Sequence, residues 1–223
     1  SGCSVVMGGG RSLRSPRIQR GTGTIGRNSK KLFPPLVQKA LCEAKNRGLK
    51  LKVMFEDEGR FGRISDPSSC WAPKRTRPIV HKQMVREYTY SYAAVDPQEG
   101  EVDSLILPNM YATTMSVFLR ELSDRHPDCY ILLVMDGAPC HRAGDLEIPG
   151  NIRITELPPY SPELNPAEHL WDAMRERDFK NVTFTSMEKV ERAMVSSLRT
   201  LEEDRERIKT MTGFPWILRA LPA

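Results

Sequence analysis

Three acidic residues, far apart in the chain, stand in local sequences that suit a divalent-metal site. Asp57 lies near the end of the apolar segment 49–58, Asp136 directly follows another apolar run, and Glu168 comes shortly after a proline-rich stretch. Hard cations such as Mg²⁺ take oxygen ligands, and two ions roughly 3.5 to 4 Å apart can stabilise both the attacking and the leaving oxygen of a phosphoryl displacement. The three acids therefore predict a site that cuts and joins nucleic acid, provided that the fold gathers them.

The elements that must position these acids follow from apolar periodicity and capping residues. The predicted strands are Leu49–Glu58, Ser69–Val80, Glu87–Asp96, Glu101–Leu107, Cys129–Met135 and Ile152–Leu157. The predicted helices are Pro35–Arg47, Thr113–His126, Pro166–Phe179, Met187–Leu201 and Asp204–Met211. An antiparallel meander followed by helix, strand and helices indicates the α/β class, a mixed sheet flanked by helices in which Cys129–Met135 is a central strand.

Length and composition indicate one main globular domain. The chain has 223 residues, of which 39% are hydrophobic, and its longest apolar run is far shorter than the ~20 residues of a membrane helix. The five cysteines are odd in number and form no Cys-x-x-Cys pair. This pattern argues against a disulfide framework or a structural zinc site, and we expect no membrane partner and a reducing, cytoplasmic location.

Positive charge is concentrated at the N-terminus. Residues 1–31 contain seven Lys or Arg and no Asp or Glu, which leaves residues 32–223 with a formal charge of −2, since the whole chain carries +5. A basic segment rich in Gly and Ser cannot bury enough apolar surface to fold alone, and it suits contact with a phosphate backbone. We therefore divide the chain into a flexible basic arm, 1–31, and a folded domain, 32–223; a leader without a role is the alternative for the arm.

Each candidate residue also has a purely structural interpretation. Asp136 before a glycine is a common turn signal, and Glu168 has the spacing of a helix-capping acid. Side-chain alternation puts Asp57 opposite both neighbours, so Glu58 is the second choice of ligand. His141 could orient a ligand or the scissile phosphate, or it could be an ordinary surface residue.

A basic stretch between residues 60 and 86 contains Trp71. Positive charge beside an aromatic ring suits a surface that tracks DNA. We expect Trp71 in the core and several of the cations on DNA. The foremost DNA-contact candidates are Lys74, Arg75 and Arg77.

Several segments resemble mariner-like transposases of bacterial insertion sequences, the insertion sequence 630 family. Segment 157–171, LPPYSPELNPAEHLW, is similar to the block around the third catalytic acid of that family, and segment 135–141, MDGAPCH, is similar to its second-aspartate block. Segment 55–58 resembles the first-aspartate block, 71–78 a second-strand motif, and 214–216 the C-terminal ending. The resemblance covers roughly residues 32 to 218.

The resemblance implies a ribonuclease-H-like (retroviral integrase-like) fold and a catalytic triad of Asp57, Asp136 and Glu168 that holds two Mg²⁺ or Mn²⁺ ions. It implies a DNA endonuclease and strand transferase that acts at transposon ends in DNA transposition and integration. DNA, as terminal repeats and target, would be the partner, with a homodimer or synaptic assembly and a nucleoid-associated location in a bacterium.

One departure from the family pattern leaves alternatives open. Family members carry an N-terminal helix-turn-helix region that recognises the element's inverted repeats, whereas only a basic arm precedes the catalytic part here. A catalytically idle, transposase-derived DNA-binding protein is the main alternative. An RNA-cleaving nuclease or junction resolvase of the same fold is a third.

Overall fold

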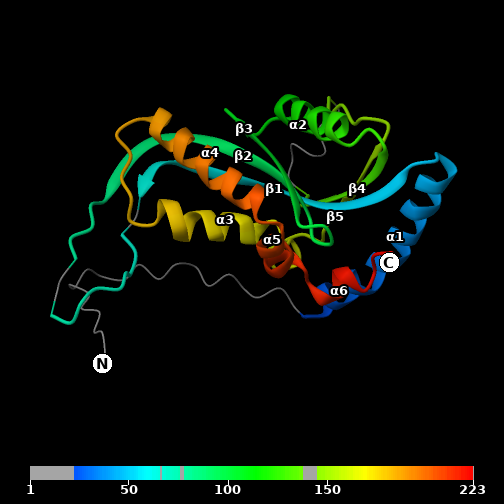
Figure 1. Ribbon diagram of the computed structural model, residues 1–223, viewed down its shortest axis with the longest axis horizontal. Coiled ribbons are helices and arrows are strands. Elements are labelled where there is room, and N and C mark those ends of the chain that lie inside the picture. The colour runs from blue at the N-terminus through cyan, green and yellow to red at the C-terminus, as the bar shows by residue number, and fades with distance from the viewer. Residues whose placement is uncertain (1–22, 66, 76–77, 138–144, 223) are drawn as a thin grey trace.

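The computed structural model describes residues 23–65, 67–75, 78–137 and 145–222, with side chains from Lys30 onward (Figure 1). None of the helices in this part of the chain combines the length and the apolarity needed to cross a bilayer.

A single mixed sheet of five strands forms the centre of the fold. The strands are β1 (Lys50–Ser65), β2 (Gln83–Asp96), β3 (Glu101–Leu107), β4 (Cys129–Met135) and β5 (Ile152–Glu156), in the spatial order β3-β2-β1-β4-β5. β1, β2 and β3 pair antiparallel as a meander, whereas β4 pairs parallel with β1 and β5 pairs parallel with β4. The predicted α/β class is confirmed, and β4 is an interior strand between β1 and β5, while β1 occupies the middle of the sheet.

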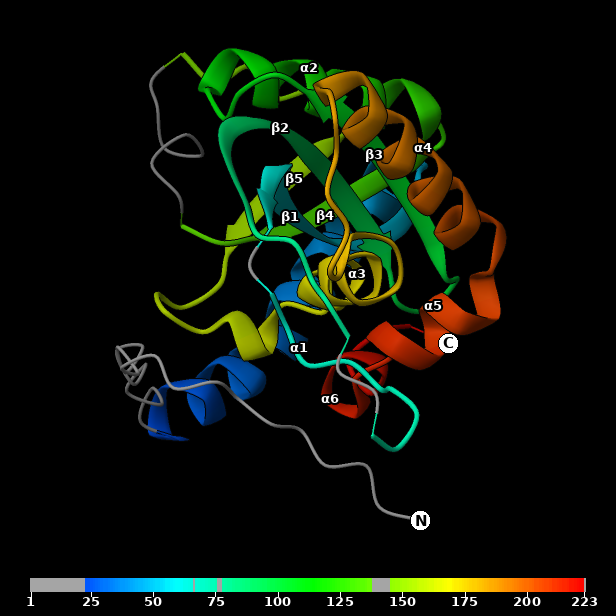
Figure 2. The ribbon, with the colours of Figure 1, turned by 90° about the vertical axis from the view of Figure 1, so that its left-hand side faces the viewer.

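Helices cover both faces of the sheet. They are α1 (Gly23–Asn46), α2 (Ala112–Arg125), α3 (Glu168–Met174), α4 (Met187–Glu203), α5 (Arg205–Thr212) and α6 (Pro215–Leu218). A 3₁₀ turn, Pro162–Leu164, precedes α3, and a π-helical turn, Arg175–Phe179, continues it. Figures 1 and 2 show α2 on one side of the sheet and α3 on the other.

The pleat of the central strands decides which side chains meet which helices. Phe55 and Val134 belong to one buried cluster together with side chains of α1, α3 and α4, whereas Met54 and Met135 belong to a second cluster with side chains of α2. Because successive strand residues point to opposite faces, residues two positions beyond Phe55 and Val134 also face the side that α3 covers.

Two sequence predictions about elements are wrong. The predicted strand Ser69–Val80 does not form in the described residues 67–75 and 78–82, and β1 instead continues to Ser65 by pairing with β2. Pro67, Pro73 and Pro78 interrupt this segment, and proline cannot donate to a strand ladder.

The first helix begins at Gly23 rather than Pro35, so residues 23–31 of the predicted arm are helical. Two prolines therefore lie inside the helix. Phe33, just before them, packs 5.1 Å from Trp216 and 5.8 Å from Phe55, ring centre to ring centre. These contacts of Phe33 stabilise the helical turn before the two prolines, where local sequence preference predicts that the helix has not yet begun.

Gly59 allows α3 to approach β1 closely. A Cβ atom at this position would lie 2.7 Å from the Trp171 ring, which is only 1% exposed and cannot move aside. We expect Gly59→Ala to lower the free energy of unfolding by about 1 to 3 kcal/mol, the usual cost of overpacking. Urea denaturation measures this loss.

Gly150→Ala is the matched control, because no atom lies within 4 Å of its added Cβ. Equal stability of the two variants would show that Trp171 does not pack on β1 as the structure has it.

Candidate active site

Two of the predicted acids meet where β1 and β4 stop pairing. The last pairs in the parallel register are Met54 with Leu133 and Phe55 with Val134. Continuing this register by two residues places Asp57 beside Asp136, on the sheet face that α3 covers. Neighbouring strands lie about 4.8 Å apart, so the strand pairing alone brings these two backbone positions together.

The third acid comes from the first turn of α3, and the segment before it is fixed to β1. The Asn165 side-chain amide, which is buried, donates to the carbonyl oxygen of Glu56 at 2.8 Å, and its Oδ1 accepts from the backbone N–H of Ala167 at 3.2 Å. Asn165 therefore bridges the residue before Asp57 and the start of the helix that carries Glu168. The prediction that the helix begins at Pro166 with Asn165 as its cap is wrong, because α3 begins at Glu168 and Ala167 occupies the cap position.

A hydrogen bond between α3 and β1 orients the first acid. Trp171 Nε1 donates to Asp57 Oδ2 at 2.8 Å, while the Trp171 ring packs edge-on against Phe61. On a helix, Trp171 lies one turn after Glu168 and on the same side. Docking α3 on the sheet therefore positions Glu168 and holds Asp57 in one step.

The three carboxylates influence one another electrostatically. Burial, followed by the negative charge of Glu168, raises the pKa of Asp57 to about 8, with smaller contributions from Glu58 and Asp136, while the Trp171 hydrogen bond opposes the rise. Burial also raises the pKa of Glu168. The positive charge of Arg175 lowers this pKa, whereas the negative charges of Asp172 and Asp136 raise it further. Each of the three acids thus acts on at least one of the others.

The donor chemistry fits a hard divalent cation. All three side chains offer carboxylate oxygens, and a cation among them would relieve the mutual repulsion that raises the pKa of Asp57. As they stand, however, no three His, Cys, Asp or Glu side chains of the described segments are close enough to hold a metal ion. Binding therefore requires the carboxylates to draw together.

The remaining predicted site residues are placed differently. Glu58 follows Asp57 on β1, so its side chain leaves the other face of the sheet. Lys74 and Arg75 form an exposed turn, in which Arg75 has a positive φ of 72°. His141 and Arg77 lie outside the described residues. Their suggested roles stay predictions.

The structure also corrects Trp71 and identifies contacts that sequence reasoning missed. Trp71 is 90% exposed rather than part of the core, whereas Trp171 packs as predicted and in addition binds Asp57. Its spacing of three residues from Glu168 on one helix was the available signal for this second role.

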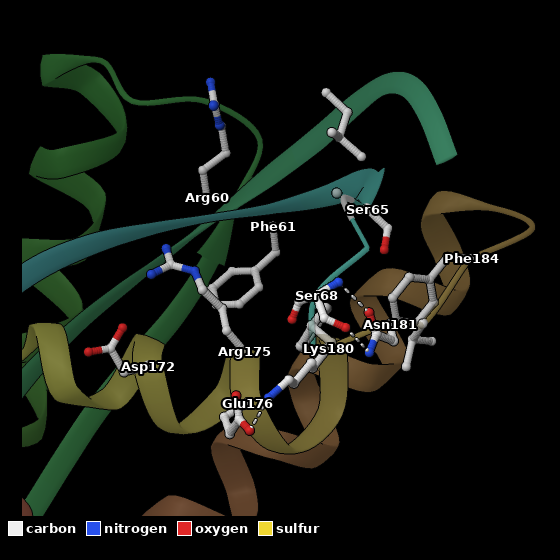
Figure 3. Close-up of a pocket in the computed structure, with 14 residues that line it drawn as sticks. Arg60, Phe61, Ser65, Ser68, Asp172, Arg175, Glu176, Lys180, Asn181 and Phe184 are labelled. Carbon is white, nitrogen blue, oxygen red and sulfur yellow. Dashed lines mark hydrogen bonds and ion pairs between the residues drawn. The ribbon is translucent and has the colours of Figure 1, made fainter. Parts of the chain in front are cut away.

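A pocket of about 490 Å³ lies between β1 and the helical stretch that continues α3, and its lining starts three residues after Asp57 and four residues after Glu168 (Figure 3). Its lining includes cationic, aromatic and small polar side chains, among them Arg60, Phe61, Ser68, Arg175, Lys180 and Asn181. The sequence did not predict this pocket, because its two walls come from segments 60–68 and 172–184, which become neighbours only in the folded chain.

The raised pKa of Asp57 makes the metal-free protein less stable as pH rises. The native state keeps a proton that the unfolded chain loses above the ordinary value of 3.8, so stability falls between about pH 4 and pH 8. Asp57→Asn removes the titrating carboxyl, and the amide oxygen can still accept the hydrogen bond from Trp171. At pH 8, in EDTA, we expect the variant to be more stable by roughly 1 to 3 kcal/mol, with the gain vanishing near pH 4.

Thermal and urea unfolding across this pH range measure the difference. Asp124→Asn, an exposed position at the end of α2, is the control for the loss of one carboxylate. A constant difference between wild type and Asp57→Asn from pH 4 to pH 8 would refute the proposed electrostatic strain.

Comparisons with known proteins identify the family and the fold of this chain. A family model described as DDE superfamily endonuclease matches residues 52–191. The chain is 36% identical over 98 residues to the uncharacterized protein y4pE/y4sA of Sinorhizobium fredii (strain NBRC 101917 / NGR234), a match that covers 44% of this chain and 73% of that protein.

Solved structures of Mos1 transposase share the fold. The Mos1 paired-end complex with the left transposon end matches with a TM-score of 0.53 at 17% identity, over 94% of this chain and 67% of that chain. The Mos1 mariner paired-end complex with Mn matches with a TM-score of 0.52 over the same shares, also at 17% identity. The mixed sheet and its flanking helices thus form the predicted ribonuclease-H-like fold. Since the family model spans more than half of the sequence, the chain belongs to the DDE superfamily endonucleases and has the fold of the mariner transposase catalytic core.

Proposed function

We propose that this chain is the catalytic domain of a transposase, a divalent-metal-dependent DNA endonuclease and strand transferase that acts at the ends of a mobile element. The observation that supports this most directly is the convergence of Asp57 from the middle of β1, Asp136 from the end of β4 and Glu168 from the start of α3 on one face of the sheet. The electrostatic effect of Glu168 and Asp136 on Asp57 supports the same grouping.

Mg²⁺ or Mn²⁺ is the proposed cofactor, as two ions. Asp57 and Asp136 would hold one ion, and Asp57 and Glu168 the other, so Asp57 would serve both. Such a pair, when bound, makes the attacking oxygen more nucleophilic and stabilises the oxygen that leaves phosphorus. The solved Mos1 complex with Mn supports this choice of metal.

The chain's own residues prepare the acids for this task. Trp171 holds Asp57 Oδ2 and leaves Oδ1 to other contacts, and Asn165 ties the start of α3 to β1. Because the pKa of Asp57 is raised to about 8, ion binding must displace a proton at neutral pH. Metal affinity should therefore increase as pH rises toward 8.

The proposed partner is DNA, both as transposon ends and as target, bound by a homodimer or a larger synaptic assembly of a cytoplasmic, nucleoid-associated bacterial protein. The fold shared with a Mos1 complex that contains a transposon end supports DNA as the substrate. Basic residues 1–31, together with Lys74, Arg75 and Arg77, would add contacts to the phosphate backbone.

Nicking of a supercoiled plasmid that carries the element's terminal repeats tests this proposal. We expect activity that requires Mg²⁺ or Mn²⁺ and that EDTA abolishes. Asp57→Asn, Asp136→Asn and Glu168→Gln should each reduce the rate by about 10³-fold or more, because each removes an anionic ligand worth several kcal/mol in the transition state.

Glu163→Gln is the matched control, since this exposed acid lies in the 3₁₀ turn before α3, five residues before Glu168. We expect it to nick at the wild-type rate. Full activity in Asp57→Asn or Asp136→Asn would disprove the triad, and DNA binding without any metal-dependent product would disprove the enzymatic function.

A further inference from the structure

The seam between β1 and α3 continues beyond the carboxylates into the pocket of Figure 3. Asp57, Gly59 and Phe61 share one face of β1, and Glu168, Trp171 and Arg175 share the facing side of the helix, at spacings of three and seven residues. Gly59 and Phe61 both meet the Trp171 ring, and Phe61 also meets Arg175. Moving outward from the acids on the α3 side, Asp172 comes first and also lines the pocket, and Arg175 is the first positively charged side chain.

Phe61 supports the Arg175 side chain. The Arg175 guanidinium carbon lies 5.6 Å from the centre of the Phe61 ring, and Phe61 itself is only 4% exposed and held against Trp171 and Phe179. Figure 3 shows Arg175 beside Phe61 under the strand, while Arg60 projects from the strand's other side. A guanidinium resting on a fixed ring keeps its N–H groups available along its edge.

Among the cations around the pocket, Arg175 and Arg60 are without an ion pair to a carboxylate of the described residues, and of these two only Arg175 lies on the helix side beside Phe61. Arg63 pairs with Glu87, Arg177 with Asp178, and Lys180 with Glu176. Among the described residues, no carboxylate forms an ion pair with Arg175, although the side chain is exposed in a pocket. Its charge nevertheless reaches the site, because it lowers the pKa of Glu168. The Arg175 side chain is therefore placed to bind an anionic group of a ligand in the pocket.

We propose that Arg175 binds a DNA phosphate one or two nucleotides from the scissile bond, and that the pocket between β1 and the π-helical turn holds this stretch of the strand. This inference rests on the proposed function and adds the path of the substrate. The Cα atoms of Glu168 and Arg175 are roughly 10 Å apart along the helix, and the arginine side chain leans back toward the helix N-terminus. That distance matches the next phosphates along a strand whose scissile phosphate lies at the acids.

The salt dependence of DNA binding tests this inference without requiring catalysis. The full chain is titrated in EDTA against a fluorescein-labelled duplex of about 30 base pairs over a range of NaCl concentrations. We expect Arg175→Ala to weaken binding about tenfold near 0.1 M NaCl and to reduce the slope of log K against log salt by about 0.9, the value for one lost phosphate contact. Arg175→Lys should retain the slope because it keeps the charge.

Arg192→Ala is the control for the loss of one exposed positive charge, because Arg192 lies on α4 and pairs there with Glu188. It should leave the slope unchanged. If Arg175→Ala binds with the affinity and slope of Arg192→Ala, the inference is overturned. The wild-type protein could fail to nick DNA while Arg175→Ala still shows a lowered slope. That result would support the phosphate contact and reject the proposed transposase activity, so the failure of either proposal can be recognised separately.

Discussion

The parallel pairing of β1 with β4 is the constraint on which the rest of the site depends. Parallel strands run in the same direction, so acids at equal offsets beyond the last paired residues of two such strands must be neighbours. The register from Lys50–Cys129 to Phe55–Val134 meets that condition for Asp57 and Asp136. A shift of one residue would turn one of the two side chains to the α2 face.

The docking of α3 adds the third acid and is secured by polar as well as apolar contacts. Leu170, Trp171 and Met174 bury the helix against the sheet, while Asn165 and Trp171 each make one hydrogen bond to β1, at Glu56 and at Asp57. Apolar burial drives association but is not directional, whereas these two bonds fix where along β1 the helix lies. The same helix continues as a π-helical turn that forms one wall of the neighbouring pocket.

Gathering the acids has an energetic cost that bears on function. A carboxylate with a pKa near 8 is one that burial and neighbouring charges disfavour as an anion. Clusters of this kind are common where a charged ligand or a proton must be accepted. The surrounding core has buried side chains on both faces of β4, and the free energy of this apolar burial offsets the cost of gathering the carboxylates.

The excursion between β1 and β2, whose described residues are 67–75 and 78–82, forms no strand or helix. Side chains from distant parts of the sequence hold it in place. Asn181 makes two hydrogen bonds to the backbone of Ser68, and Gln83 makes two to the backbone of Phe184, so amide side chains fasten both ends of the excursion to the chain after α3. Between them, Trp71 remains exposed. Alternating apolar residues could not distinguish this arrangement from a strand, because the partners lie about a hundred residues away.

The sequence by itself determined the fold class, most of the strands and helices, and the three acids with their family resemblance, because apolar periodicity and motif spacing are local properties. The tertiary structure decided those features that depend on contacts between residues far apart in the sequence. Examples are the helical continuation of α1 through Phe33, the exposed excursion around Trp71, and the contact between Trp171 and Asp57. The electrostatic coupling of the acids and the unpaired charge of Arg175 beside Phe61 likewise exist only where β1 and α3 meet, since no local pattern records which elements become neighbours.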